Sequence, residues 1–161
     1  DVLTGEFEIR RADVLYDAGR SPNPAIDVGQ IEGGYVQGVG FVTTEEVLYD
    51  ERGGLVTDNT WSYKPPCSKT IPVDFRVRLR TPNTPRDLEE SRAESVAVKS
   101  SKTAGEPGLV LGISAYFALK RAILAARREQ AQDDSWFRLD APATTQQIQT
   151  HCLVSADHLS L

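Results

Sequence analysis

The feature that most constrains the fold is an apolar run that begins abruptly after a short polar segment. Residues 100–107 read Ser-Ser-Lys-Thr-Ala-Gly-Glu-Pro, and almost every residue from there to Leu119 is apolar. Pro107 suits the first position of a helix, because its missing N–H would be unpaired there anyway. Apolar residues around the whole circumference are typical of a helix that is buried on every side. The sequence therefore predicts a long buried helix from Pro107 to residue 128.

Glu106 stands at the mouth of this predicted helix, where free backbone N–H groups and the positive end of the helix dipole collect. Gly105, directly before it, lets the backbone come close to a bulky neighbour. A carboxylate in this position is either a helix cap or a reacting group. The residues alone leave both interpretations open, with the cap as the simpler one.

A second long helix is predicted with Asn23 as its N-cap and Pro24 at its first position. Apolar residues then recur at helical spacing as far as Val42. Each glycine in a helix interior costs about 0.8–1 kcal/mol relative to alanine, so another backbone or a ligand is expected against this helix, and close helix packing is the simpler explanation. The glycines stand at positions 29, 33, 34, 38 and 40, and they do not complete a G-x-G-x-x-G nucleotide motif.

The remaining patterns predict short strands and loops. Residues 6–17 alternate as a half-buried strand with a bulge at 10–11, and residues 71–79 alternate as a second strand. Further expectations are a turn at 53–54, an extended segment at 55–63, a mobile solvated loop at 81–94, a short strand at 96–98 and a last short helix at 142–152. The predicted fold class is α+β, with mixed strands and two long buried helices.

Composition narrows the possible functions. The chain of 161 residues suits one domain, and its net charge of −5 offers no basic surface for a nucleic acid. No run of about 18 apolar residues occurs, so no membrane span is predicted. Cys67 and Cys152 form no C-x-x-C motif, which argues against an iron–sulfur or zinc site and indicates a reducing compartment. His151 and His158 are expected at the surface.

Three sequence blocks together resemble a known family. The first joins residues 17–19 to Asn-Pro-Ala-Ile-Asp-Val-Gly-Gln-Ile-Glu-Gly at 23–33, and the second reads Ser-Lys-Thr-Ala-Gly-Glu-Pro at 101–107. The third reads Phe-Arg-Leu-Asp-Ala-Pro-Ala-Thr at 137–144. The set, with Tyr-Lys-Pro at 63–65, has the order found in the molybdenum hydroxylases, the family of xanthine dehydrogenase/oxidase and aldehyde oxidase. It is similar to the C-terminal part of the molybdenum-cofactor domain.

The resemblance implies roles for the matching residues. Glu106 would be the catalytic glutamate beside molybdenum, where it would act as a general base. Gln30 would hydrogen-bond the pyranopterin, and the loop that lines this cofactor would comprise Lys102, Thr103, Ala104 and Gly105. The cofactor would be molybdenum–molybdopterin, shared with residues outside this chain, and no metal ligand is assigned within it. The full enzyme would also carry FAD and two 2Fe-2S clusters.

The same resemblance makes residues 1–161 an incomplete, C-terminal fragment of the molybdopterin-binding domain. A chain that contains no methionine and opens at Asp1 fits that expectation. The implied activity is the oxidation of purines such as hypoxanthine and xanthine with water-derived oxygen, with electrons passing through the iron–sulfur and FAD domains to NAD or oxygen.

Two alternatives stand beside this reading of the substrate. One is an aldehyde oxidase that acts on aldehydes and N-heterocycles, and Gly108 keeps this open because xanthine dehydrogenases usually have a second proline there. The other is a fragment with only a structural or dimerisation role, inactive in isolation. The expected partners are a purine or aldehyde substrate, upstream domains of the same protein and a second copy in a homodimer, in the cytoplasm or the peroxisome.

Overall fold

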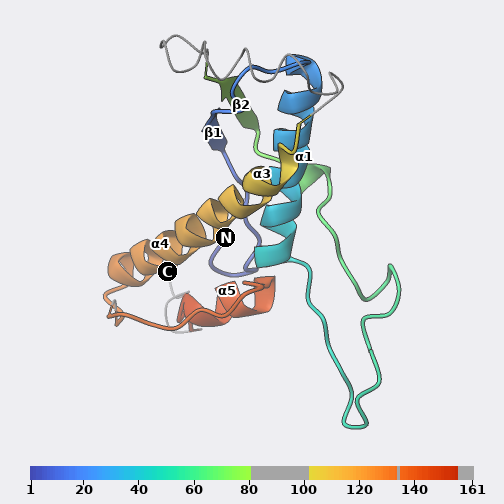
Figure 1. Ribbon diagram of the computed structural model, residues 1–161. Coiled ribbons are helices and arrows are strands. Elements are labelled where there is room, and N and C mark those ends of the chain that lie inside the picture. Colours follow the sequence, from blue (N-terminus) through green and yellow to red (C-terminus); the bar gives the residue numbers. More distant parts are fainter. Residues whose placement is uncertain (81–101, 134, 156–161) are drawn as a thin grey trace.

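The computed structural model describes residues 1–80, 102–133 and 135–155. The long helix α1 stands at the centre, a two-stranded sheet covers one side of it, and α3 crosses it and leads into α4 (Figure 1). The elements are β1 (Arg11–Tyr16), α1 (Pro24–Thr43), the short 3₁₀ helix η1 (Ser68–Thr70), β2 (Asp74–Leu79), α3 (Gly105–Leu111), α4 (Ile113–Glu129) and α5 (Thr145–His151). The predicted loop 81–94 and strand 96–98 lie outside the described residues.

The predicted glycine-rich helix is confirmed as α1. Asn23 has extended backbone dihedral angles, and its side chain accepts a hydrogen bond from the Ile26 N–H at 3.4 Å, as an N-cap does. Pro24 occupies the first position. The helix buries Ile31, Tyr35, Val39 and Val42, which recur at intervals of three or four residues on one face.

Two of the α1 glycines permit a close approach to α3. A Cβ atom on Gly34 would lie 2.2 Å from the Gly105 carbonyl oxygen, and one on Gly38 would lie 2.0 Å from the Leu109 carbonyl oxygen. No real Cβ contact is that short, so only glycine fits at either position. Close helix packing, the simpler explanation of these glycines, is therefore correct for Gly34 and Gly38.

The helix predicted from Pro107 onward differs from the structure in two respects. It begins at Gly105, so Pro107 is the third residue of the helix. An N–H at that position would still have no hydrogen-bond partner within the helix, so proline is tolerated there. The helix also divides at Gly112 into α3 and α4. The break lies against α1, because a Cβ on Gly112 would stand 2.6 Å from the Gly38 carbonyl carbon.

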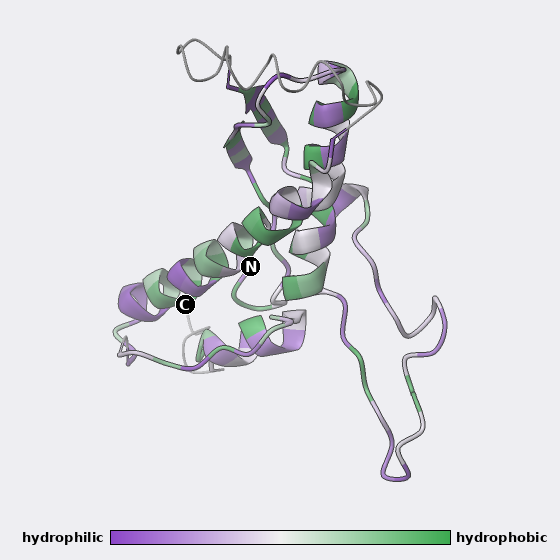
Figure 2. Ribbon diagram, viewed as in Figure 1, coloured by the Kyte–Doolittle hydropathy of each residue, from purple (hydrophilic) through white to green (hydrophobic). Residues whose placement is uncertain are grey.

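The prediction that this helix is buried on every side is wrong. Val110 keeps 66% of its surface exposed, and Ile113 and Phe117 are also exposed. Figure 2 shows the apolar colour concentrated where α3 and the start of α4 meet α1, and polar residues toward the far end of α4. By length and composition alone, the segment Gly105–Glu129 could cross a membrane, a criterion that core helices of soluble proteins also meet.

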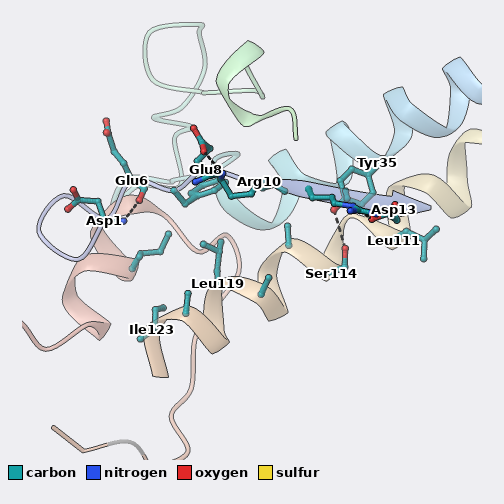
Figure 3. Close-up of a pocket in the computed structure, with 18 of the residues that line it drawn as sticks. Asp1, Glu6, Glu8, Arg10, Asp13, Tyr35, Leu111, Ser114, Leu119 and Ile123 are labelled. Carbon is teal, nitrogen blue, oxygen red and sulfur yellow. Dashed lines mark hydrogen bonds and ion pairs between the residues drawn. The ribbon is translucent and has the colours of Figure 1, made fainter. Parts of the chain in front are cut away.

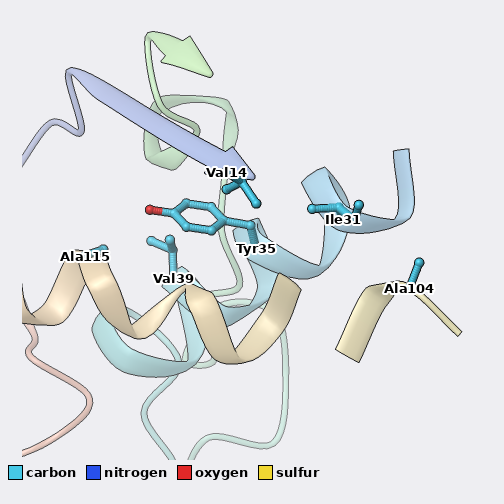
Figure 4. Close-up of a cluster of buried hydrophobic side chains, with 6 residues drawn as sticks. All are labelled: Val14, Ile31, Tyr35, Val39, Ala104 and Ala115. Carbon is cyan, nitrogen blue, oxygen red and sulfur yellow. The ribbon is translucent and has the colours of Figure 1, made fainter. Parts of the chain in front are cut away.

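The sheet consists of β1 and β2 in parallel, with Val14 opposite Val77. Alternate residues of β1 face α1, and the Tyr35 ring packs between β1 and α4, 5.1 Å from the Phe75 ring (Figure 4). The strand predicted at 71–79 is confirmed from Asp74 to Leu79, as β2. The strand predicted at 6–17 is confirmed only from Arg11 to Tyr16, without the expected bulge within it.

The segment between α1 and η1 forms an arm that extends away from the body of the molecule and returns to α1 at η1 (Figure 1). The predicted turn at 53–54 is present, with the Asp50 carboxylate accepting hydrogen bonds from the N–H groups of Arg52 and Gly54. The extended strand predicted at 55–63 is wrong, because an isolated bridge between Tyr49 and Leu55 is all the strand pairing described there. Trp61 is 86% exposed.

A second apolar cluster holds α5 against α4, and the predicted last helix is confirmed. The cluster contains Ile123, Leu139, Ala143, Ile148 and Cys152. Arg127 is only 4% exposed, donates a 2.6 Å hydrogen bond to the His151 carbonyl oxygen and lies 4.1 Å from the Phe137 ring. His151, expected at the surface, is half-buried, and its ring stands 5.0 Å from that of Phe137.

Candidate functional site

A cavity of about 400 Å³ lies between α1 and the segment that leads into α3. Two stretches far apart in sequence form its walls, and they are two of the blocks that carry the family resemblance. The lining residues are Gly29, Gln30, Gly33, Gly34 and Gln37 from the first stretch, and Lys102, Thr103, Ala104, Gly105, Glu106 and Leu109 from the second.

Where α3 crosses α1, successive residues of α3 contact successive turns of α1, so the two ends of the cavity can be distinguished. Gly105 lies beside Gln30, and Leu109 lies beside Gly34 and Gly38 one to two turns further along α1. Gln30 and the loop 102–105 therefore define one end of the cavity, and Gln37 with Leu109 the other. Glu106, in the first turn of α3, lines the same cavity.

Loop contacts hold the first end in place. The Lys102 ammonium group donates a 2.8 Å hydrogen bond to the Ala18 carbonyl oxygen, which ties the second block to the loop before α1. Ser21 donates a 2.5 Å hydrogen bond to the carboxylate of Asp27, which is fully buried in the first turns of α1. Ala104 is buried against the main core. These contacts fix the backbone of the loop relative to Gln30.

The glycines on the cavity wall fall into two classes. Gly34 is in contact with the α3 backbone, whereas a Cβ on Gly29 or Gly33 would meet nothing within 4 Å. These two glycines therefore make the α1 wall shallow, as a flat bulky group would need. The polar groups of the cavity also suit a large polar heterocycle, because side-chain amides, a hydroxyl group and loop N–H groups can donate hydrogen bonds and a carboxylate can accept them.

Every residue that the resemblance assigns to catalysis or to the cofactor lines this one cavity. Gln30, Lys102, Thr103, Ala104, Gly105 and Glu106 all belong to its walls, and the side chains of Gln30 and Glu106 are exposed to it. Sequence reasoning missed Gln37 and Leu109. Helical spacing could have found both, because Gln37 lies two turns from Gln30 and Leu109 one turn from Glu106.

Protein metal ligands are not gathered here. Among the described residues, no group of three or more His, Cys, Asp or Glu side chains could hold a metal ion. Both cysteines are free thiols, with Cys67 exposed on the arm and Cys152 buried beneath α5. The cavity offers polar side chains, loop backbone and one carboxylate, that of Glu106, to a bound group.

Comparison with known proteins identifies the family. Residues 1–72 match the sequence model of a family described as "Molybdopterin cofactor-binding domain". Probable aldehyde oxidase 3 of Oryza sativa subsp. japonica is 44% identical over 155 residues, which cover 94% of this chain and 11% of that protein. Xanthine dehydrogenase/oxidase of Mus musculus is 43% identical over 155 residues, which cover 95% of this chain and 11% of that protein.

A solved structure of the Cu,Mo-CO dehydrogenase in its carbon monoxide reduced state aligns with a TM-score of 0.67 at 23% identity. The alignment covers 94% of this chain and 17% of that chain, so the α+β arrangement is the fold of one part of that protein. The chain likewise spans 11% of the length of the two relatives. On these sequence comparisons, the chain belongs to the molybdenum hydroxylase family, and its residues 1–72 match a molybdopterin cofactor-binding domain.

Proposed function

We propose that this chain forms one wall of the molybdopterin site of a molybdenum hydroxylase, with Glu106 at the reacting end. The observation that carries the proposal is that Gln30 and Glu106, on different helices and far apart in sequence, line the same cavity. The match of residues 1–72 to a molybdopterin cofactor-binding domain supports it. In this proposal, residues 1–161 are one part of a larger cofactor domain in a longer protein.

The cofactor would lie along the α1 wall. Gln30 would donate and accept hydrogen bonds at the polar edge of the pterin, as a side-chain amide can. The backbone of Thr103, Ala104 and Gly105 would line its other side, with the loop held by the Lys102 contact to Ala18. When bound, the molybdenum centre would supply the oxidising power and the water-derived oxygen of the reaction.

Glu106 would act as a general base. Its carboxylate can accept a proton from a group within hydrogen-bond distance, and such positioned bases contribute about 10²–10⁴-fold to rate. The residue is in the first turn of α3 but does not cap it, because α3 has no side-chain cap at its first position. The cap interpretation of Glu106 therefore has no support from the helix geometry.

The test is Glu106→Gln in the full-length protein of which this chain is part. Glutamine keeps the shape of the Glu106 side chain but lacks the carboxylate that would accept the proton. Molybdenum content should therefore stay normal while turnover falls by about 10²–10⁴-fold. Glu129→Gln, an isosteric change at the exposed end of α4, is the matched control and should leave turnover unchanged. Near-normal turnover of Glu106→Gln with full molybdenum loading would remove Glu106 from the mechanism.

The proposed substrates are purines such as hypoxanthine and xanthine, with electrons leaving through 2Fe-2S and FAD domains of the longer protein to NAD or oxygen. A second candidate is the oxidation of aldehydes, which is favoured by the 44% identity to a probable aldehyde oxidase. Steady-state rates of the full-length protein with xanthine and with an aromatic aldehyde would distinguish the two. A rate with the aldehyde alone would reject the purine assignment.

A purely structural or dimerisation role is the competing proposal, and it applies to the chain in isolation. One carboxylate and one wall of a cavity cannot hold the cofactor, so the isolated 161 residues should show no molybdenum-dependent turnover. Turnover by the isolated chain would refute this. For the full-length protein we propose a homodimer in a reducing compartment, the cytoplasm or the peroxisome, in keeping with the two free thiols.

A further inference from the structure

A second and larger cavity lies on the opposite side of the core from the candidate site. It is a groove of about 830 Å³ between the segment 6–15, which includes all but the last residue of β1, and one face of α4 (Figure 3). None of the residues assigned to the cofactor lines it. The Tyr35 hydroxyl, 3.2 Å from the Ser114 hydroxyl, stands at one end, and Leu119 and Ile123 lie toward the other (Figure 3).

The β1 side of the groove offers main-chain hydrogen bonds. β1 pairs with β2 along one edge, in a sheet of two strands. Within the described part of the chain, no strand pairs with its other edge. A free edge of this kind presents N–H and C=O groups that another extended segment can complete. This feature favours a polypeptide over a small molecule as the occupant.

The α4 side of the groove is an apolar wall of limited length. Its residues are Leu111, the last residue of α3, and six residues on one face of α4, namely Ser114, Ala115, Ala118, Leu119, Ala122 and Ile123. From first to last the wall covers twelve residue steps, or about 18 Å at 1.5 Å per residue. An extended strand rises about 3.3 Å per residue, so the wall matches five to six residues of strand. The alanines leave space for large side chains from that strand.

Two pairs of charged groups on the rim already neutralise each other. The Arg10 guanidinium lies 3.3 Å from the Glu8 carboxylate, and that of Arg11 lies 2.6 Å from the Asp13 carboxylate. The middle of the groove therefore favours an occupant with apolar side chains over a charged ligand. Leu15, 75% exposed at the end of β1, and Leu111 are apolar groups that such an occupant would cover.

We propose that an extended segment of five to six residues, from the part of the longer protein outside these 161 residues, lies in this groove and pairs with the free edge of β1. Its alternate large apolar side chains fill the spaces over Ala115, Ala118 and Ala122. The inference rests on the proposed function only in that the chain is one part of a longer polypeptide. The chain spans 11% of the length of its relatives, so most of such a polypeptide is available to supply the segment.

Cysteine labelling in the folded full-length protein tests this proposal. Ala118 and Ala125 are both exposed residues of α4 in this chain, and only Ala118 lines the groove. Ala118→Cys and Ala125→Cys are made separately with Cys67→Ser, which removes the exposed thiol. Each protein is treated with a maleimide, and mass spectrometry of the peptide that carries the new cysteine gives its labelling rate.

If the groove is filled, position 118 should label at least about 100-fold more slowly than position 125, because reaction then requires local opening. In the 161-residue chain by itself the two rates should be similar, with Cys152 unreactive as the sign of a folded core. Similar rates in the full-length protein would overturn the proposal.

The same measurements identify the occupant. Protection at position 118 that is lost on dilution would indicate a second copy and would also overturn the proposal. Protection in the 161-residue chain alone would indicate a segment of this chain, with the same consequence. Labelling does not depend on bound cofactor, so a failed Glu106→Gln test would leave this result unaffected.

Discussion

The packing of α1 on α3 predicts opposite effects for the same substitution at two glycines of one helix. Gly33→Ala and Gly38→Ala both replace glycine inside α1. Alanine is favoured over glycine in a helix interior by about 0.8–1 kcal/mol, and this gain applies at both positions. The difference between the two variants therefore measures the α1–α3 contact alone.

The structure gives the size of that difference. At Gly33 the new Cβ would meet nothing within 4 Å, so the helix gain of about 1 kcal/mol is retained. At Gly38 it would stand 2.0 Å from the Leu109 carbonyl oxygen, and ordinary contact begins at 3.4 Å, so α3 must retreat by about 1.4 Å. Overpacking costs up to about 3 kcal/mol, which leaves Gly38→Ala about 2 kcal/mol less stable than the parent sequence.

Urea unfolding of the 161-residue chain, followed by circular dichroism, measures both effects. The two variants should differ by about 3 kcal/mol in the free energy of unfolding. In thermal unfolding, Gly33→Ala should raise the melting temperature by about 2–4 °C and Gly38→Ala should lower it by about 4–8 °C. Equal melting temperatures for the two variants would refute the close backbone contact between α1 and α3.

Three further predictions concern the cavity and two titratable side chains. The Gly33→Leu variant of the full-length protein should fold normally but lose most of its molybdenum, because the leucine side chain enters the cavity. Elemental analysis measures the molybdenum content, and full loading would contradict the proposed cofactor position. Cys67 should be alkylated well before Cys152 at pH 8. A backbone hydrogen bond from Lys69 lowers the pKa of the exposed Cys67 thiol, whereas burial raises the pKa of the Cys152 thiol. Equal alkylation rates of the two cysteines, measured by mass spectrometry, would contradict this. Burial, with the nearby Arg127 charge, lowers the pKa of His151, so the unfolded chain binds the proton more readily and stability should fall as pH drops below about 6.5. His151→Gln should reduce that loss in urea unfolding between pH 7 and 5, and an unchanged pH dependence would exclude His151 as its source.

Local signals predicted the elements that depend on local chemistry. Asn23 followed by Pro24 marked the start of α1, and alternation marked β1 and β2. The resemblance brought Gln30 and Glu106 together as cofactor-facing residues, and the structure puts them on one cavity. These features could be predicted because each depends on a short segment or on a pattern shared with relatives.

Features that depend on distant contacts were not predictable in the same way. The break at Gly112 depends on its contact with Gly38, which composition does not reveal. The exposed face of α4 was predicted to be buried because its residues are apolar, and composition does not reveal which face of a helix has a neighbour within the chain. His151 was placed at the surface because its contact with Phe137 is made by tertiary packing. Gln37 could have been predicted, because it lies two helical turns from Gln30 in the sequence.

The most direct test of the central claim is to locate the metal. Anomalous diffraction at the molybdenum absorption edge, from crystals of the full-length protein, gives the position of molybdenum relative to α1 and α3. Our account predicts a peak beside the Glu106 carboxylate, in the cavity shared with Gln30. A molybdenum peak separated from that cavity by other parts of the protein would contradict it.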